Sequence, residues 1–177
     1  AVEALTEKPQ PLSPLAYLTK SLPRLRRLGF NVVYLLPPYP IGLLGRKGIG
    51  SPYASRDFRA VEPEYGTMED IQAFIRRAHE LKLKVIFDIT PNHTARDHVW
   101  MTAHPEYYVK APDGSAFFDA DWSDTAKLDY TNHDLRAAMI EARERLLVWH
   151  RAGRASEFRV ETAPGVSCGR ILRGIRR

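Results

Sequence analysis

The sequence has little that would mark a secreted or membrane-bound protein. Its single cysteine, Cys168, excludes an internal disulfide. It has no run of about 20 apolar residues that could span a bilayer. Its first residues show no basic segment followed by an apolar one, so we expect neither a secretory signal nor membrane binding. A cytoplasmic protein is the default expectation, and a processed secreted protein would have the same composition.

The positive net charge of +5 is confined to the end of the chain. Seven arginines after residue 150 stand against two acidic residues there, so the first 150 residues carry no net charge. A basic tail on a neutral body differs from the continuous Lys/Arg face with interleaved aromatic residues that folded nucleic-acid sites present. We therefore predict no nucleic-acid binding. The composition, 44% hydrophobic and 27% charged residues, is that of a globular domain.

The chain also lacks a P-loop, and its four glycines between residues 41 and 53 do not follow the G-x-G-x-x-G spacing. Strands and amphipathic helices alternate instead. Ser13 precedes leucines at helical spacing up to Gly29, and Thr67 with Asp70 begins a second helix. We expect helices at about residues 14–28, 67–81 and 135–150, and strands at about 30–36 (apolar, and expected to be buried), 85–90 and 158–161. This order predicts an α/β fold with a parallel sheet, either open and doubly wound or part of a (βα) barrel.

Two of the expected strands end in polar residues of the kinds that active sites use. Asp88 lies near the end of one strand with His93 shortly after it, and Arg159 and Glu161 close another. In a parallel α/β fold, the carboxyl ends of neighbouring strands meet at one edge of the sheet. We therefore predict that these four side chains converge on one site. Taken alone, Asp88 fits equally well as a buried structural carboxylate paired with Arg159.

Five ordered segments resemble the α-amylase family of glycoside hydrolases (family 13), whose catalytic domains are (βα)8 barrels. They are Gly29–Pro37, similar to the second barrel strand; Ser51–Asp57 with Tyr65-Gly66-Thr67, similar to the tyrosine loop and the next helix start; Asp88–His93, similar to the conserved end of the third strand; Lys127–Asp129, similar to the motif that closes domain B; and Phe158–Glu161, similar to the fourth-strand region. The resemblance implies a partial (βα)8 TIM barrel over residues 1–163, the N-terminal part of the catalytic barrel. A short domain-B-like excursion at about 94–131 would follow the third strand.

The resemblance also implies roles for individual residues in an enzyme that cleaves or transfers α-glucosidic bonds of an α-glucan or maltooligosaccharide with retention. Glu161 stands at the position of the catalytic nucleophile, Arg159 would orient its carboxylate, and Asp88 would hold Arg159. Tyr53 would stack on the sugar beside the scissile bond, and His93 would hydrogen-bond the hydroxyls of that sugar. Two further residues, Asn92 and Asp129, match positions that hold a structural calcium ion, for which oxygen ligands are suitable.

The sequence departs from the family pattern at the nucleophile, where the family has Asp and this chain has Glu161. The additional methylene would move the carboxylate by about 1 Å, a displacement that can lower a rate about a hundredfold. The family's general acid, a Glu, has no counterpart within residues 1–177. Whether this chain is an active enzyme therefore stays open, as does its oligomeric state, and the alternative is a non-catalytic amylase-like fragment or pseudoenzyme. Residues 164–177 form an Arg-rich tail, for which a frameshifted or artificial terminus is one hypothesis.

The long segment after the third strand is rich in aromatic and histidine residues. Its aromatic residues either form a small core of the excursion, the interpretation we favour because a loop of this length needs packing of its own, or line a sugar cleft. They are Trp100, Tyr107, Tyr108, Phe117, Phe118 and Trp122. The spacing of His98, His104 and His133 relative to His93 fits no compact zinc pattern, so we interpret these three as solvated loop histidines.

Overall fold

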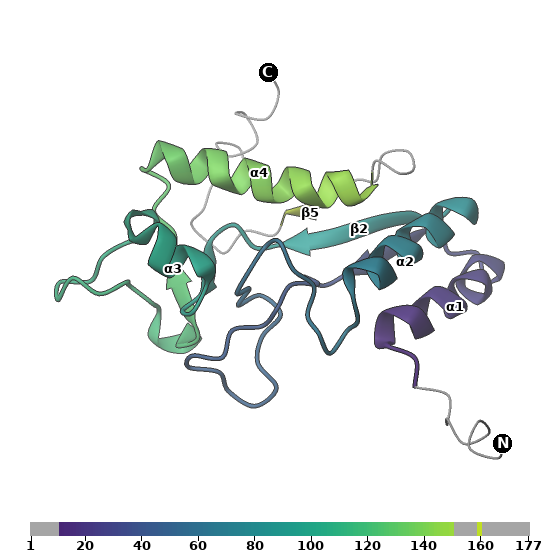
Figure 1. The fold of residues 1–177 in the computed structure, drawn as a ribbon, viewed down its shortest axis with the longest axis horizontal. Helices are drawn as coiled ribbons and strands as arrows, with labels where there is room; N and C mark the ends of the chain where they lie inside the picture. Colours follow the sequence, from purple (N-terminus) through teal and green to yellow (C-terminus); the bar gives the residue numbers. More distant parts are fainter. Residues whose placement is uncertain (1–10, 151–158, 161–177) are drawn as a thin grey trace, which may run out of the picture.

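The computed structural model describes residues 11–150 and 159–160, which form a parallel sheet, helices against it, and a small second sheet (Figure 1). Three strands lie in the order β1-β2-β5, all parallel, as the sequence predicts. The elements are α1 (Pro14–Arg27), β1 (Val32–Leu35), α2 (Met68–Glu80), β2 (Lys84–Ile89), β3 (His93–Ala95), α3 (Val99–Ala103), η2 (Pro105–Tyr107), η3 (Ala120–Trp122), β4 (Thr125–Lys127), α4 (His133–His150) and β5 (Arg159–Val160). The expected tail at 164–177 lies outside the described residues, and no described helix is long and apolar enough to cross a membrane.

The first two helices begin where the sequence predicts, and their starts are joined. The Ser13 side chain accepts a hydrogen bond from the Ala16 N–H over 3.1 Å and donates one to Asp70 over 2.9 Å. Thr67 and Asp70 form a reciprocal capping box at the start of α2. Gly66 makes this junction possible, because its φ of +139° is unfavourable for other residues and an added Cβ would lie 2.6 Å from the Asp70 carboxylate.

The core lies between α2 and the sheet. Helix α2 packs against β2, α1 and α4, and its apolar face is fully buried at Ile71, Phe74 and Ala78. On the sheet, Val85 and Phe87 of β2 are fully buried as well. This packing fixes the middle strand β2, which carries Asp88 at its carboxyl end.

Strand β1 corrects the expectation of a buried strand. Val33 is 9% exposed, but Val32, Tyr34 and Leu36 are 37%, 38% and 51% exposed. The exposed residues are two apart, so they share one face of the sheet, and Val33 on the other face packs into the core. An apolar run predicted the strand correctly, but it could not show that only one face is covered by the described residues.

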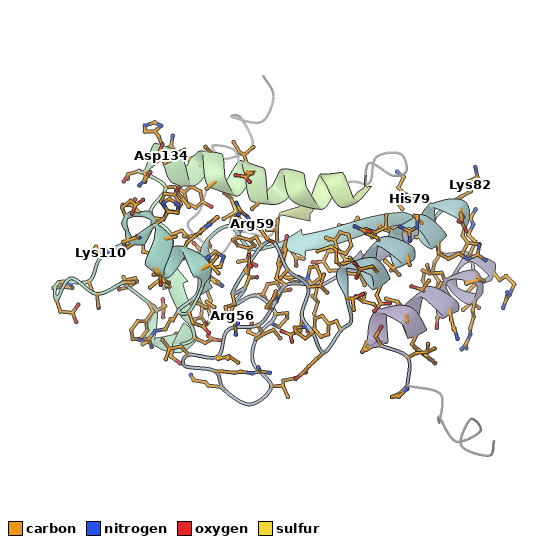
Figure 2. All side chains as sticks on the ribbon, viewed as in Figure 1. Arg56, Arg59, His79, Lys82, Lys110 and Asp134 are labelled. Carbon is orange, nitrogen blue, oxygen red and sulfur yellow. The ribbon has the colours of Figure 1, made fainter. Side chains whose placement is uncertain are left out.

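A second, antiparallel sheet follows directly after β2. Strand β3 pairs with β4, with His93 opposite Lys127, and the Leu128 N–H donates to the Asn92 carbonyl over 3.1 Å. The segment between residues 92 and 128 thus begins and ends at the same place, beside the carboxyl end of β2. At the far tip of this segment, Lys110 lies well away from the parallel sheet (Figure 2). Its equivalence to domain B stays a prediction.

The excursion has a core of its own, but its aromatic residues divide into two groups. Tyr107 and Tyr108 are 5% and 2% exposed, whereas Phe117, Phe118 and Trp122 are 37–44% exposed. Trp100 is partly buried and packs against the core, with its ring centroid 5.6 Å from that of Tyr107. The core interpretation therefore holds for the two tyrosines and Trp100, and not for the other three.

One histidine of the excursion also departs from expectation. His104 and His133 are exposed as expected, but His98 is 1% exposed. The prediction of a solvated His98 was wrong because spacing alone could not show that its ring packs between Phe58 and Trp100, with ring centroids 4.9 and 4.7 Å away.

Candidate active site

Asp88 is a buried carboxylate at the carboxyl end of the middle strand. Its exposed fraction is 0%. The Tyr34 hydroxyl donates to Oδ2 of Asp88, and the sheet register explains this contact, because Tyr34 is opposite Ile86 and Asp88 is the next residue along on the same face. The other oxygen, Oδ1, is buried and has no hydrogen-bond partner among the residues whose side chains the structure describes. A carboxylate in this position needs a cationic or hydrogen-bonding partner.

Strand β5 brings Arg159 to Asp88. The two residues are paired in the parallel register, and Ile89 is paired with Val160. This pairing agrees with the expected neighbourhood of Asp88 and Arg159. The side-chain contact between them stays a prediction, and Glu161, the expected nucleophile, lies outside the described residues.

His93 is the first residue of β3 and is 8% exposed. The Asn92 side-chain amide is 3.2 Å from Nδ1 of His93, so Nδ1 can accept a hydrogen bond from it. Burial lowers the pKa of His93, and the nearby Asp124 carboxylate and a hydrogen bond to the backbone of Tyr53 act in the opposite direction. His93 is therefore neutral at pH 7, a form that can both donate and accept hydrogen bonds.

Tyr53 is brought to His93 by that backbone hydrogen bond, although the two residues are 40 positions apart in the sequence. The Tyr53 N–H donates to the Ser51 hydroxyl over 3.2 Å, and the Tyr53 side chain is half-buried. The structure thus places the backbone of Tyr53 beside His93, while the roles of both side chains toward a sugar stay predictions.

The residues expected to hold calcium are close in the chain trace but do not form a ligand cage. The Asn92 side-chain nitrogen donates to His93, a contact that does not involve the amide oxygen. One carboxylate oxygen of Asp129 accepts hydrogen bonds from the N–H and hydroxyl of Thr131 over 2.9 and 2.8 Å. Among the described residues there is no group of three or more His, Cys, Asp or Glu that could hold a metal ion. Calcium prefers six to eight oxygen ligands, so a calcium ion here would need oxygen ligands beyond Asn92 and Asp129, and the site stays a prediction.

Sequence reasoning missed the role of Tyr34 in this region, and it named Trp122 only as one of six aromatic residues that could line a sugar cleft. Tyr34 was interpreted only as part of a buried strand, and its contact with Asp88 depends on a register that a single sequence does not reveal. The Trp122 ring lies 5.8 Å from the His93 ring, with the planes inclined by 47°. Its proximity arises from the pairing of β3 with β4, which brings residues 93 and 127 together.

A parallel sheet with a buried carboxylate and an imidazole gathered at the carboxyl ends of its strands is the arrangement of barrel-type α/β enzymes. Residues 14–126 match the model of the family described as alpha amylase, catalytic domain. The chain belongs to this family, glycoside hydrolase family 13, and forms part of its (βα)8 barrel.

Individual relatives agree with this assignment. The chain is 34% identical over 163 residues to an alpha-1,4-glucan:maltose-1-phosphate maltosyltransferase of Chlorobaculum tepidum, and the match covers 80% of the chain and 24% of that protein. An alpha-amylase from Lactobacillus plantarum has a similar structure, with a TM-score of 0.78, 43% identity, and coverage of 86% of this chain and 35% of that one. For a noncanonic maltogenic alpha-amylase from Thermotoga neapolitana the TM-score is 0.83 at 33% identity, with coverage of 93% and 40%. The chain thus spans well under half the length of these relatives.

Proposed function

We propose that this chain carries the sugar-binding and nucleophile-positioning part of a retaining enzyme that cleaves or transfers α-glucosidic bonds in α-glucans or maltooligosaccharides. Both reactions fit the relatives, because two with solved structures are named alpha-amylases and two curated ones are named alpha-1,4-glucan:maltose-1-phosphate maltosyltransferases. The two reactions share a covalent glycosyl-enzyme intermediate and differ in the acceptor, which is water or another sugar. The comparisons give no support to the alternative of a pseudoenzyme.

The observation that carries the proposal is the environment of Asp88. A carboxylate without solvent exposure, bonded on one oxygen by Tyr34 and placed in register with Arg159, is suited to hold a guanidinium. A charge-assisted pair of this kind fixes the arginine, which can then orient the carboxylate two residues further on, at Glu161. In the proposed reaction the Glu161 carboxylate bonds to the anomeric carbon while the glycosidic C–O bond breaks, and the departing oxygen takes a proton from the general acid, a Glu in this family. The negative charge of Glu161 stabilises the oxocarbenium-like transition state.

His93 and Tyr53 supply the sugar-binding part of the proposal. Asn92 and the Tyr53 backbone hold the His93 ring in one orientation. Sugar hydroxyls bind at this ring in the proposal, and the Tyr53 ring offers an apolar surface to the pyranose face. Calcium at Asn92 and Asp129 stays a separate proposal, since it needs oxygen ligands beyond these two. An increase in the melting temperature of the chain with millimolar calcium, lost in Asp129→Ala, would support it.

The experiment that tests the function is calorimetric titration of the 177-residue chain with maltotriose, and with its β-linked counterpart cellotriose as the control sugar. We expect maltotriose to bind more tightly, and His93→Ala to weaken its binding about tenfold, which corresponds to the loss of one net hydrogen bond. His104→Ala is the matched control, because His104 is an exposed histidine of the same excursion that stacks on Tyr107. Equal binding of the two sugars, or equal effects of the two substitutions, would contradict the proposal.

A further inference from the structure

We infer that Trp122 is an aromatic platform for a second glucose unit, adjacent to the unit at His93, and that it sets the length of oligosaccharide that the site prefers. This inference rests on the proposed function and adds a residue to the binding site. It also assigns a function to the excursion, because a residue outside the parallel sheet would then complete the sugar-binding surface.

The first support is the position of the ring. Trp122 is 44% exposed while its ring centroid lies 5.8 Å from that of His93, which is 8% exposed. A large apolar ring that stays open beside a buried polar ring has no packing role comparable to that of Tyr107 or Tyr108. Exposed aromatic rings of this kind usually mark a surface at which something binds.

The second support is that the backbone around Trp122 is held in place on both sides. Its N–H donates to the Asp119 carbonyl over 3.0 Å, and its carbonyl accepts from the Thr125 hydroxyl over 2.9 Å. Arg96 donates to the next two carbonyls along the chain. Its guanidinium donates to the Ser123 carbonyl over 3.2 Å, and its backbone N–H donates to the Asp124 carbonyl, also over 3.2 Å. A ring on a fixed backbone loses little freedom when a ligand stacks on it.

The glycine-rich loop between residues 41 and 53 also packs against the turn that carries Trp122. Gly45 lies so close to Ser123 that an added Cβ would be 2.6 Å from the Ser123 carbonyl oxygen, and its φ is +76°. The loop can approach the Trp122 turn this closely only with a glycine at this position. Arg96 and the loop thus both contact the turn at the Ser123 carbonyl.

The third support is the mixed chemistry around the ring. A pyranose has an apolar face and a rim of hydroxyls, and sugar sites combine aromatic surface with a few polar groups. His93 supplies such a polar group, since the centroid of its ring lies 5.8 Å from that of the Trp122 ring. The aromatic surface of Trp122 and the polar ring of His93 therefore lie side by side, as a site for a sugar requires.

Phe118 offers a matched comparison within the same segment. It is 37% exposed, close to the value for Trp122, but the Arg96 guanidinium already lies 4.3 Å from the centre of its ring. One face of Phe118 is thereby occupied by a cation. We expect no sugar contact there, so Phe118→Ala controls for the general loss of an exposed aromatic ring from the excursion.

The experiment is a calorimetric titration of the 177-residue chain with glucose, maltose, maltotriose and maltotetraose. In the wild type we expect affinity to rise with length until the platform is occupied. Trp122→Ala should weaken the longer sugars about tenfold and leave glucose unchanged, which is the loss expected for removing roughly 50 Å² of apolar contact. Trp122→Phe should keep most of the affinity, and Phe118→Ala should keep all of it.

A second measurement guards against a misfolded alanine variant. The fluorescence of Trp122 should change when a sugar stacks on it, and Trp122→Phe should abolish this change while binding persists. Binding that rises with length equally in the wild type and in Trp122→Ala, or an unaltered fluorescence response in Trp122→Phe, would overturn the inference alone. A failure of all four sugars to bind the wild type would overturn the proposed function and the inference with it.

Discussion

His98 is a histidine whose protonation the folded chain resists. Its ring is 1% exposed, and its Nδ1 accepts a hydrogen bond from the Trp100 N–H over 3.0 Å. Its Nε2 is buried and has no hydrogen-bond partner among the described side chains. Burial lowers the pKa of His98 from 6.5 to about 3. The physical reason is that an imidazolium in this environment would lose its hydration without gaining a counter-charge.

The sign of the resulting pH dependence follows from the two pKa values. Below pH 6.5 the unfolded chain binds a proton at His98, while the folded chain does not until the pH approaches 3. Stability is therefore complete above pH 6.5 and falls as the pH decreases through this window. The slope for one proton is about 1.4 kcal/mol per pH unit, so acidification from pH 6.5 to 5 should remove about 2 kcal/mol through His98 alone.

The measurement is urea-induced unfolding of the chain at pH 7, 6 and 5, compared with His98→Asn. Asparagine keeps an acceptor at the N-cap of α3 but does not titrate. We expect the variant to be about 1–2 kcal/mol less stable at pH 7, because the packed ring is lost, and to show a pH slope smaller by about 1.4 kcal/mol per unit. His104→Asn, at an exposed position, should leave the slope unchanged. A His98→Asn variant with the wild-type slope would refute the reasoning.

Two further predictions concern the sheet. Tyr34→Phe removes the donor to the buried Asp88 carboxylate and should lower the free energy of unfolding by about 1.5–3 kcal/mol in urea denaturation. Tyr17→Phe is the control in the same assay, because Tyr17 is 67% exposed. Equal effects of the two substitutions would contradict the role of the Tyr34 hydroxyl. The apolar residues exposed on one face of β1 should make the chain self-associate, which sedimentation velocity measures. Val32→Lys should reduce this association. A wild-type chain that stays monomeric at all concentrations would contradict an open sheet face.

The helices could be predicted from the sequence because their signals are local. The serine before Pro14, and Thr67 with Asp70, satisfy backbone groups within three residues, so they act wherever the rest of the chain lies. The strands were located for a similar reason, since an apolar run bounded by turn residues is visible without knowledge of its neighbours. Burial of β1 was predicted wrongly because burial depends on which elements cover each face, and that information is not local.

The candidate site shows the same division. That Asp88 and His93 would follow a strand was visible in the sequence, and the proximity of Asp88 to Arg159 followed from the parallel arrangement. The contacts of Tyr34 with Asp88 and of Trp122 with His93 were not visible, because each depends on a strand register. A shift of one residue in either register would move the side chain to the opposite face. The burial of His98 depends likewise on Phe58, which is 40 residues away.

These register-dependent contacts explain how an apolar sheet face can carry a charged group. Val32, Tyr34 and Ile86 lie on the same face of the sheet as Asp88, because Tyr34 is opposite Ile86 and side chains alternate along each strand. On β2 this face carries Lys84, Ile86 and Asp88, so the carboxylate stands at the opposite end of the row from the exposed lysine, next to apolar residues, where its ionised form is costly unless it is bonded. Tyr34 belongs to that row through its ring and reaches Asp88 through its hydroxyl. The apolar residues therefore fix the strands, and the single hydroxyl among them orients the carboxylate toward the edge where β2 meets Arg159 of β5.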